Sequence, residues 1–100
     1  MVKHIVVWRL KETAHCNTKE KNAMIIKEKL EALNGKIPGM IKLEVGINFS
    51  QEENVSDIVL YSEFDSKESL KNYQTHPEHK AVMPFVMEAR SERRMVDYEV

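Results

Sequence analysis

The segment LKNYQTHPEHKAVMPF, residues 70–85, gathers side chains around Pro77 that could carry out proton transfer. A histidine titrates near neutral pH, because its unperturbed pKa is about 6.5, so His79 could act as a general base. The hydroxyl of Tyr73 could donate a hydrogen bond to an oxyanion that develops on a substrate. We predict that His79 and Tyr73 form a catalytic pair if the Pro77 corner folds both side chains toward one pocket.

The same residues also fit a purely structural role. Tyr73 would then be a core aromatic residue whose hydroxyl reaches the surface. His79 would begin a helix and bond to the backbone or to Glu78. Motif spacing this short does not decide between the two interpretations, and both stay open at this point.

His4 lies in an apolar segment and shares one face of the expected strand with Trp8. If that face lies beneath the helices, His4 points into the same pocket as Tyr73 and His79. The apolar neighbours would form the pocket wall, or simply the hydrophobic core. The predicted pocket residues are His4, Val6, Trp8, Val82, Phe85 and Val86.

Other chemistries find little support in the residue pattern. His76 and His79 are metal-ligand types at short spacing, but they straddle a proline, and a zinc site needs three or four ligands. Cys16 has only the adjacent His15 as a basic neighbour, which disfavours nucleophilic catalysis. No glycine-rich phosphate loop or dinucleotide fingerprint is present. We therefore expect no metal at these side chains and no cofactor.

The composition is that of one globular domain, which we place over residues 1–100. Apolar residues make up 42% of the chain, and 15 basic side chains nearly balance 16 acidic ones. That balance argues against binding to nucleic acid or to an anionic membrane. The densest basic stretch is interleaved with acids, which indicates a solvated surface. It comprises Arg90, Arg93 and Arg94 with Glu88, Glu92 and Asp97.

The single cysteine excludes an intrachain disulfide, so we expect a reducing, cytoplasmic location. No apolar run approaches the roughly 20 residues of a membrane span.

Hydrophobic periodicity predicts four strands and two helices, with the second helix broken in two. Asn17, with Glu20 three residues later, is predicted to cap the first helix, and Ser66 the second. Pro77 ends the first half of the second helix, and Pro84 is placed near the first turn of the next half. The expected strands cover residues 2–10, 41–47, 55–64 and 94–100, with a polar loop over residues 11–16.

The order βαββαβ predicts a ferredoxin-like α+β fold, an antiparallel sheet with helices packed on one face. Its first and third strands are central, and their sequences IVVW and IVLY are apolar on both faces. Such strands need cover on both faces, and one helical layer covers only one. We predict a homodimer in which two sheets pack face to face into an α+β barrel. The alternative is a monomer that exposes a few apolar side chains.

Three segments resemble the stress-responsive A/B barrel (Dabb) domain family: VKHIVVWRLK, DIVLYSEFDSKESLKNYQTHPEH and RRMVDYEV. The resemblance covers nearly the whole chain and implies a dimeric α+β barrel. A plant polyketide cyclase of this family performs an aldol condensation without a cofactor. By position in the motif, the resemblance implies that its base corresponds to His79, its tyrosine donor to Tyr73 and a cavity histidine to His4.

The chain departs from that cyclase at the substrate pocket. Ile58 stands where the cyclase has a further histidine, and NAMIIKEKL in the first helix lacks aromatic residues that form its tail-binding pocket. The resemblance therefore implies a small carbonyl compound instead of a long-chain polyketide. Other family members are stress-associated proteins without an assigned reaction, and cofactor-free monooxygenases share the dimeric barrel architecture.

Two functions remain as hypotheses. The first is cofactor-free acid–base chemistry, of the cyclase or aldol type, or specific binding, on a small organic carbonyl compound. The second is a non-catalytic, stress-associated structural or interaction protein. A cavity of at least about 300 Å³ with both Tyr73 and His79 pointing inward would favour the first, and a collapsed interior with Tyr73 in solvent the second.

Overall fold

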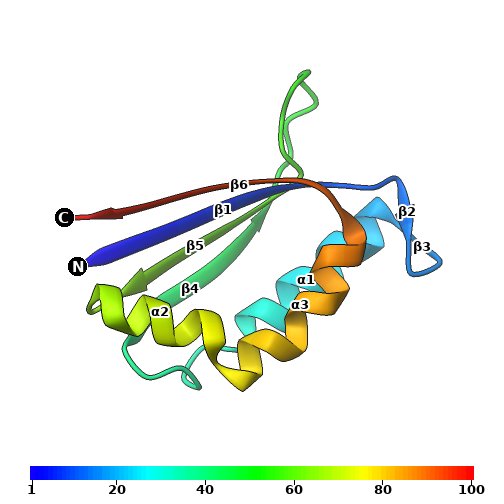
Figure 1. Cartoon of the computed structure of the whole chain (residues 1–100). Helices are drawn as coiled ribbons and strands as arrows, with labels where there is room; N and C mark the ends of the chain where they lie inside the picture. The colour runs from blue at the N-terminus through cyan, green and yellow to red at the C-terminus, as the bar shows by residue number, and fades with distance from the viewer.

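A computed structural model describes all residues 1–100 and shows a four-stranded antiparallel sheet with three helices on one face (Figure 1). The strand order β4-β5-β1-β6 confirms the predicted ferredoxin-like fold. The elements are β1 (Val2–Leu10), β2 (Thr13–Ala14), β3 (Asn17–Thr18), α1 (Lys19–Glu31), β4 (Met40–Ile47), β5 (Ile58–Phe64), α2 (Lys67–Thr75), α3 (Pro77–Ala89) and β6 (Arg90–Glu99). None of the helices is long and apolar enough to cross a membrane.

The central strand β1 fixes the two faces of the sheet. It pairs with β5 on one side and with β6 on the other, so its side chains can point only above or below the sheet. Every even-numbered residue from Val2 to Leu10 is buried beneath the helices, and every odd-numbered residue between them is half-buried. β5 alternates in the same way, from buried Ile58 to buried Phe64. The predicted central position of both strands is confirmed.

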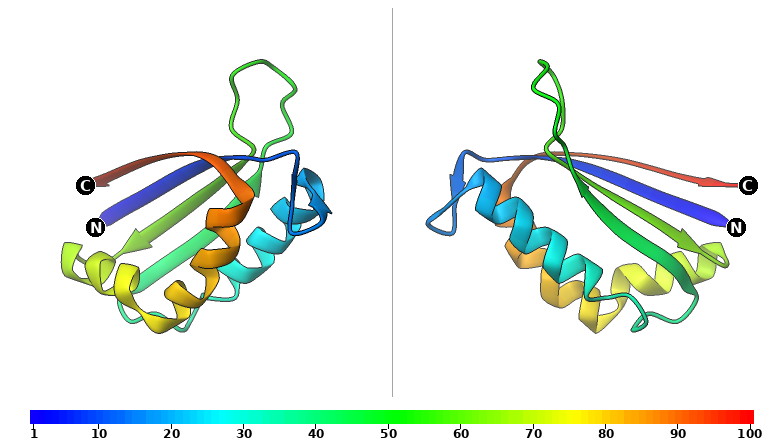
Figure 2. Two further views of the ribbon diagram at one scale, coloured as in Figure 1. Left: turned by 45° about the vertical axis from the view of Figure 1, so that its right-hand side comes forward. Right: turned by 180° about the vertical axis from the view of Figure 1, so that it is seen from behind.

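The opposite face of the sheet carries no helix (Figure 2). Apolar side chains of three strands lie next to one another there. Ile5 pairs with Tyr61 on β5 and with Val96 on β6, and Val7 pairs with Val59. We call the surface formed by these five residues the outer sheet face.

The start of α1 differs from the prediction. Its N-cap is Thr18 and not Asn17, because the hydroxyl of Thr18 accepts the N–H of Lys21 at 3.2 Å. The Asn17 side chain instead donates to the side chain of Asn22 at 3.2 Å. The expected loop before the helix contains a short hairpin, β2–β3, which moves the helix start by one residue.

The corner between α2 and α3 forms as predicted, but the second proline does not lie where it was expected. His76 has an extended backbone, and its ring nitrogen Nδ1 accepts the N–H of Glu78 at 3.1 Å, so it caps α3. Pro77 is the first residue of α3. Pro84 lies within the helix and not in its first turn. It is tolerated because it is exposed, so the carbonyl of Lys80 that loses its helical partner can face water.

Three strands have bounds that differ from the prediction. β4 begins one residue earlier, at Met40. β6 begins at Arg90 instead of Arg94 and pairs with β1 along its full length, with one shift of register after Arg9. The first residues of β6 are mostly charged, so hydrophobic alternation did not indicate a strand there. An edge strand forms through backbone hydrogen bonds and does not require that alternation. β5 begins at Ile58, and the residues expected before it belong to the loop of residues 48–57.

The two chain termini lie side by side at one end of the sheet, and the loop of residues 48–57 projects at the other end (Figure 1). The N–H of Val100 donates to the carbonyl of Met1 at 2.9 Å, and the amino group of Met1 donates to the carbonyl of Val100 at 3.1 Å. These bonds extend the pairing of β1 and β6 to the chain ends.

We expect Gly39→Ala to destabilise the fold much more than Gly35→Ala. Both glycines have a positive φ, 80° and 82°, so an alanine costs about 1–2 kcal/mol at either position. A Cβ at Gly35 would meet nothing, whereas at Gly39 it would lie 2.6 Å from the Cβ of Ser69. The overpacking adds about 1–3 kcal/mol to the loss at Gly39. Urea unfolding of both variants measures the difference, and equal losses would contradict this account.

Candidate functional site

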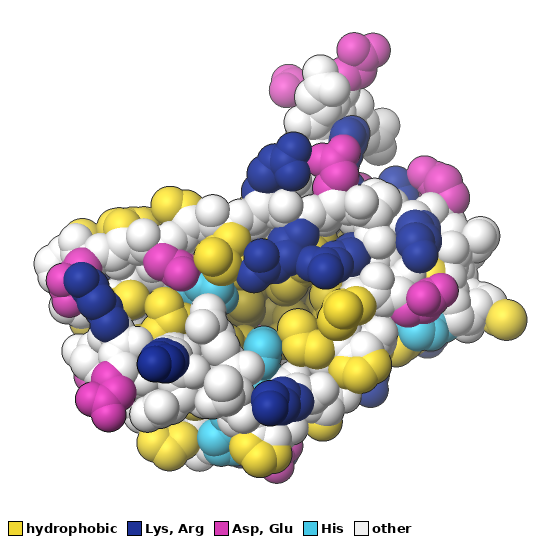
Figure 3. All heavy atoms as spheres, in the orientation of Figure 1, with side chains coloured by type: hydrophobic (Ala, Val, Ile, Leu, Met, Phe, Trp, Pro, Cys, Tyr) yellow, Lys and Arg dark blue, Asp and Glu magenta, His cyan; other side chains and the backbone are white.

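A small cavity of about 70 Å³ lies between the helix-facing side of the sheet and the helices α2 and α3. It has a mainly apolar floor, and Figure 3 shows hydrophobic and histidine side chains in a hollow on this face. Six residues of the predicted site line it together: His4, Val6, Trp8, Tyr73, His79 and Val86.

The other two predicted wall residues do not line the cavity. Val82 is buried in the core, and the ring of Phe85 stacks on His15 with ring centroids 4.0 Å apart. The phase of α3 explains the correction, since residues spaced three and four apart share a helix face. The residues of α3 and its C-cap that line the cavity follow one another at this spacing: His79, Met83, Val86, Met87 and Arg90. Val82 and Phe85 lie to one side of this row, at its margin and beyond it.

Tyr73 is the most deeply buried polar feature of the site. Only 1% of its surface is exposed, and its hydroxyl has no hydrogen-bond partner. Its ring packs between those of Phe64, with centroids 5.2 Å apart, and His79, at 4.4 Å. Burial raises the pKa of the Tyr73 hydroxyl far above its usual value near 10, so the group stays a protonated donor at neutral pH.

His79 stands on the first turn of α3 with one ring nitrogen engaged. Its Nδ1 lies 3.2 Å from the carbonyl oxygen of Gln74, so we assign the proton to Nδ1, which donates to that carbonyl. Nε2 then keeps a free lone pair. Burial lowers the pKa of His79 below its usual 6.5, and the nearby charge of Arg93 acts in the same direction. His79 is therefore a neutral proton acceptor at pH 7.

His4 points from β1 to the same side, and its partner is a residue that sequence reasoning missed. Its Nδ1 donates to the carboxylate of Asp97, which the strand register places directly opposite on β6. In the neutral ring the free Nε2 becomes an acceptor. The ring of His4 lies edge-on to Tyr73 with centroids 6.2 Å apart. The only sequence signal that Asp97 faces the helices was its alternation with Val96. Its pairing with His4 could not be predicted without the register between β1 and β6, which are far apart in the chain.

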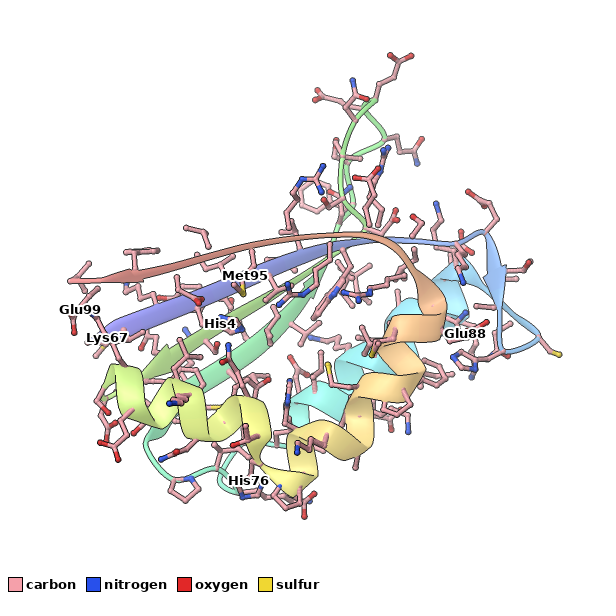
Figure 4. All side chains as sticks on the ribbon, in the orientation of Figure 1. His4, Lys67, His76, Glu88, Met95 and Glu99 are labelled. Atoms are coloured by element: carbon pink, nitrogen blue, oxygen red, sulfur yellow. The ribbon has the colours of Figure 1, made fainter.

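The remaining chemistry-bearing residues lie elsewhere. His76 lies at the outer side of the α2–α3 corner, away from His4 (Figure 4), where it caps α3. His15 bonds to the backbone of Phe85 at 3.0 Å, and Cys16 is exposed. Nowhere do three His, Cys, Asp or Glu side chains gather closely enough to hold a metal ion.

The site thus places one hydroxyl donor between two histidine acceptors at a single cavity. A carbonyl oxygen in this cavity could accept a hydrogen bond from the Tyr73 hydroxyl, and a histidine that lines the same cavity could remove a proton from the carbon next to that carbonyl. The orientation of Tyr73 and the cavity volume, which were expected to distinguish a ligand site from a structural role, favour different interpretations. Tyr73 faces inward, but the cavity is smaller than about 300 Å³.

Comparison with known proteins gives both a family and a fold. A family model described as the stress responsive A/B barrel domain matches residues 2–100. A dimeric protein of unknown function with a ferredoxin-like fold from Bacteroides fragilis is 41% identical, with a TM-score of 0.88 over 99% of this chain and 95% of that chain. A dimeric ferredoxin-like protein of unknown function from Thermobifida fusca is 19% identical, with a TM-score of 0.85 over 99% and 90% of the two chains.

A further solved structure has a name that includes an activity. A hydroxynitrile lyase from Passiflora edulis is 18% identical, with a TM-score of 0.82 over 99% of this chain and 92% of that chain. At this identity the likeness shows the fold alone. No protein of curated function matches the chain in sequence.

We expect Tyr73→Phe to raise the free energy of unfolding by about 1–2 kcal/mol, because it removes a buried hydroxyl that has no partner. The matched control is Tyr61→Phe, which removes a hydroxyl that donates to Glu63 at 2.6 Å and should lower stability or leave it unchanged. Urea unfolding measures both. A clear loss of stability in Tyr73→Phe would show that the hydroxyl is paired in solution and would contradict this account.

Proposed function

The chain belongs to the stress-responsive A/B barrel domain family, and we propose that its cavity binds a small organic carbonyl compound and catalyses cofactor-free proton transfer on it. The reaction would be of the cyclase or aldol type, with His79 as the base and Tyr73 as the hydrogen-bond donor. The observation that carries the proposal is the Tyr73 hydroxyl, which is buried and unpaired at the wall of a cavity. Buried hydroxyls almost always have a partner, so this one fits a site that a ligand oxygen completes.

The order of steps follows from the two groups. The substrate carbonyl oxygen accepts the Tyr73 hydroxyl, and Nε2 of His79 removes a proton from the adjacent carbon, which gives an enolate. The enolate carbon attacks a second carbonyl of the same molecule and forms a carbon–carbon bond. The resulting alkoxide takes the proton back from His79, so the base is regenerated. The lowered pKa of His79 keeps it ready to accept a proton at pH 7.

His4 has a supporting role in this scheme. Its bond to Asp97 fixes the ring orientation and leaves Nε2 as an acceptor toward the cavity side. A carboxylate that holds a histidine in this way is a common arrangement in catalytic sites. The Passiflora edulis protein is a lyase by name, which supports the proposal only in that this fold can serve a lyase.

One observation favours a second function, that of a non-catalytic, stress-associated structural or interaction protein. The cavity volume of about 70 Å³ is small for a ligand pocket. On this interpretation Tyr73 is a core residue, and the bond from His79 to the carbonyl of Gln74 ties the two sides of the Pro77 corner together.

The protein's partner in this proposal is a second copy of itself. The outer sheet face is apolar and uncovered by any helix, and the similar proteins from Bacteroides fragilis and Thermobifida fusca are described as dimeric. Two such faces packed together would close an α+β barrel and remove the apolar surface from water. The single, exposed Cys16 supports a cytoplasmic location, where thiols stay reduced.

We expect the protein to accelerate deuterium exchange at the methyl group of pyruvamide, the neutral amide of pyruvic acid, measured by proton NMR in heavy water. His79→Gln should slow this exchange at least about 100-fold, because the base is lost. His15→Gln, which changes a histidine outside the cavity, should leave it unchanged. Because burial lowers the pKa of His79, the rate should rise with pH at values below 6.5 and level off above it.

The same experiment separates the two functions. Exchange no faster than in buffer alone would contradict the catalytic proposal and leave the structural role ahead. Exchange that survives in His79→Gln but is lost in His4→Gln would assign the base to His4 and overturn the role of His79.

We expect Val7→Arg to convert the homodimer into a monomer, because it places a charge in the middle of the outer sheet face. Met24→Arg is the control, since Met24 is an exposed apolar residue on α1, on the helix-covered side. Sedimentation equilibrium measures the mass of each variant. A monomeric wild-type protein at micromolar concentration would overturn the dimer proposal.

A further inference from the structure

Two arginines at the mouth of the cavity have no carboxylate partner. Arg90 and Arg93 both line the cavity, and neither has an acidic group within 4.0 Å. The neighbouring Arg94 lies 3.9 Å from Glu92, and Arg9 also reaches Glu92, at 3.6 Å. Basic side chains lie along one lip of the hollow in Figure 3. A cation without a counter-ion at a concave site is a candidate for an anionic ligand.

The sequence pattern concealed this feature. The arginines and acids of residues 88–97 alternate along the chain, which indicated a solvated surface. The pairing of β6 separates Arg93 from the adjacent Glu92, because neighbouring residues of a strand point to opposite faces. Arg93 lies opposite Trp8 on the helix-facing side, and Glu92 lies opposite Arg9 on the other side.

The strand register places three side chains of β6 on the same side of the sheet as the cavity. Arg93, Met95 and Asp97 follow one another on the helix-facing side of β6, opposite Trp8, Val6 and His4 in turn. A guanidinium nitrogen of Arg93 contacts the sulfur of Met95 at 3.2 Å, so this side chain extends along the strand. Arg90 and Arg93 therefore bring positive charge to the cavity. Asp97 does not line the cavity itself but bonds to His4, which does.

We propose, as a refinement that rests on the function proposed above, that the ligand is a short oxo acid with a second carbonyl group, which receives the enolate carbon. Its carboxylate binds Arg93 and Arg90, and its keto oxygen accepts a hydrogen bond from the Tyr73 hydroxyl. The planar guanidinium offers paired donors that match a carboxylate. The carboxylate of Asp97 bonds to the cavity residue His4, so a negative charge on the ligand is disfavoured beside His4 and favoured beside the arginines. In that orientation the carbon beside the keto group lies toward the histidines.

The test compares pyruvate with pyruvamide, which has the same shape but no charge. Binding is followed by the NMR signals of the histidine rings at low salt. We expect the wild-type protein to bind pyruvate at least about tenfold more tightly than pyruvamide. Arg93→Gln should abolish this preference without weakening pyruvamide binding, and Arg93→Lys should retain part of it. Lys80→Gln is the control, because it removes an exposed charge beside His79 that does not line the cavity, and the preference should stay.

Three results would overturn the inference, and they are distinguishable. If pyruvamide binds as well as pyruvate, the small-molecule site stands but the carboxylate subsite does not. If the preference persists in Arg93→Gln and also in the double variant with Arg90→Gln, another group recognises the charge. If neither compound shifts any histidine signal, the proposed function and this inference fail together.

Discussion

The alternation of side chains along β1 is the constraint on which both surfaces of this protein depend. Because β1 is hydrogen-bonded on both sides, its residues cannot rotate out of their assigned faces. His4, Val6 and Trp8 therefore enter the cavity, and Ile5 and Val7 form the outer sheet face. A slip of one residue would exchange the two sets and would also separate His4 from its carboxylate partner. The cavity and the outer sheet face are consequences of one register.

The α2–α3 corner supplies the rest of the site at some cost in stability. Pro77 interrupts the helical path, so residues on either side of it can face each other, and the rings of Tyr73 and His79 meet across the corner at 4.4 Å. The hydroxyl that results is buried and has no acceptor within the protein. A core designed for stability alone would place phenylalanine there. Retention of a polar atom in such a place is a common sign of a site shaped for binding or catalysis.

Most of the fold could be predicted from the sequence, because hydrophobic periodicity and helix-ending residues are local signals. The bounds of β1 and the break at Pro77 followed directly from such patterns. Thr18 was missed as the cap because Asn17 is an equally good capping residue and a two-residue strand leaves no periodic signal. His4, Tyr73 and His79 were predicted to meet, and they do line one cavity. Asp97 and the free arginines were not, because their positions depend on strand pairing between residues far apart in the chain. The cavity volume depends on packing, which no local pattern reveals.

The adjacency of the chain ends has a consequence for how this domain can be rearranged. Met1 and Val100 are hydrogen-bonded to each other, so a short linker could join them without moving either strand. New ends could then be opened in the loop of residues 48–57, which projects from the far end of the sheet. The circularly permuted chain would run β5 to β6 and then β1 to β4, with every strand pair retained. The same adjacency would also allow two copies to be joined in tandem, with the linker at the margin of the sheet and outside the cavity.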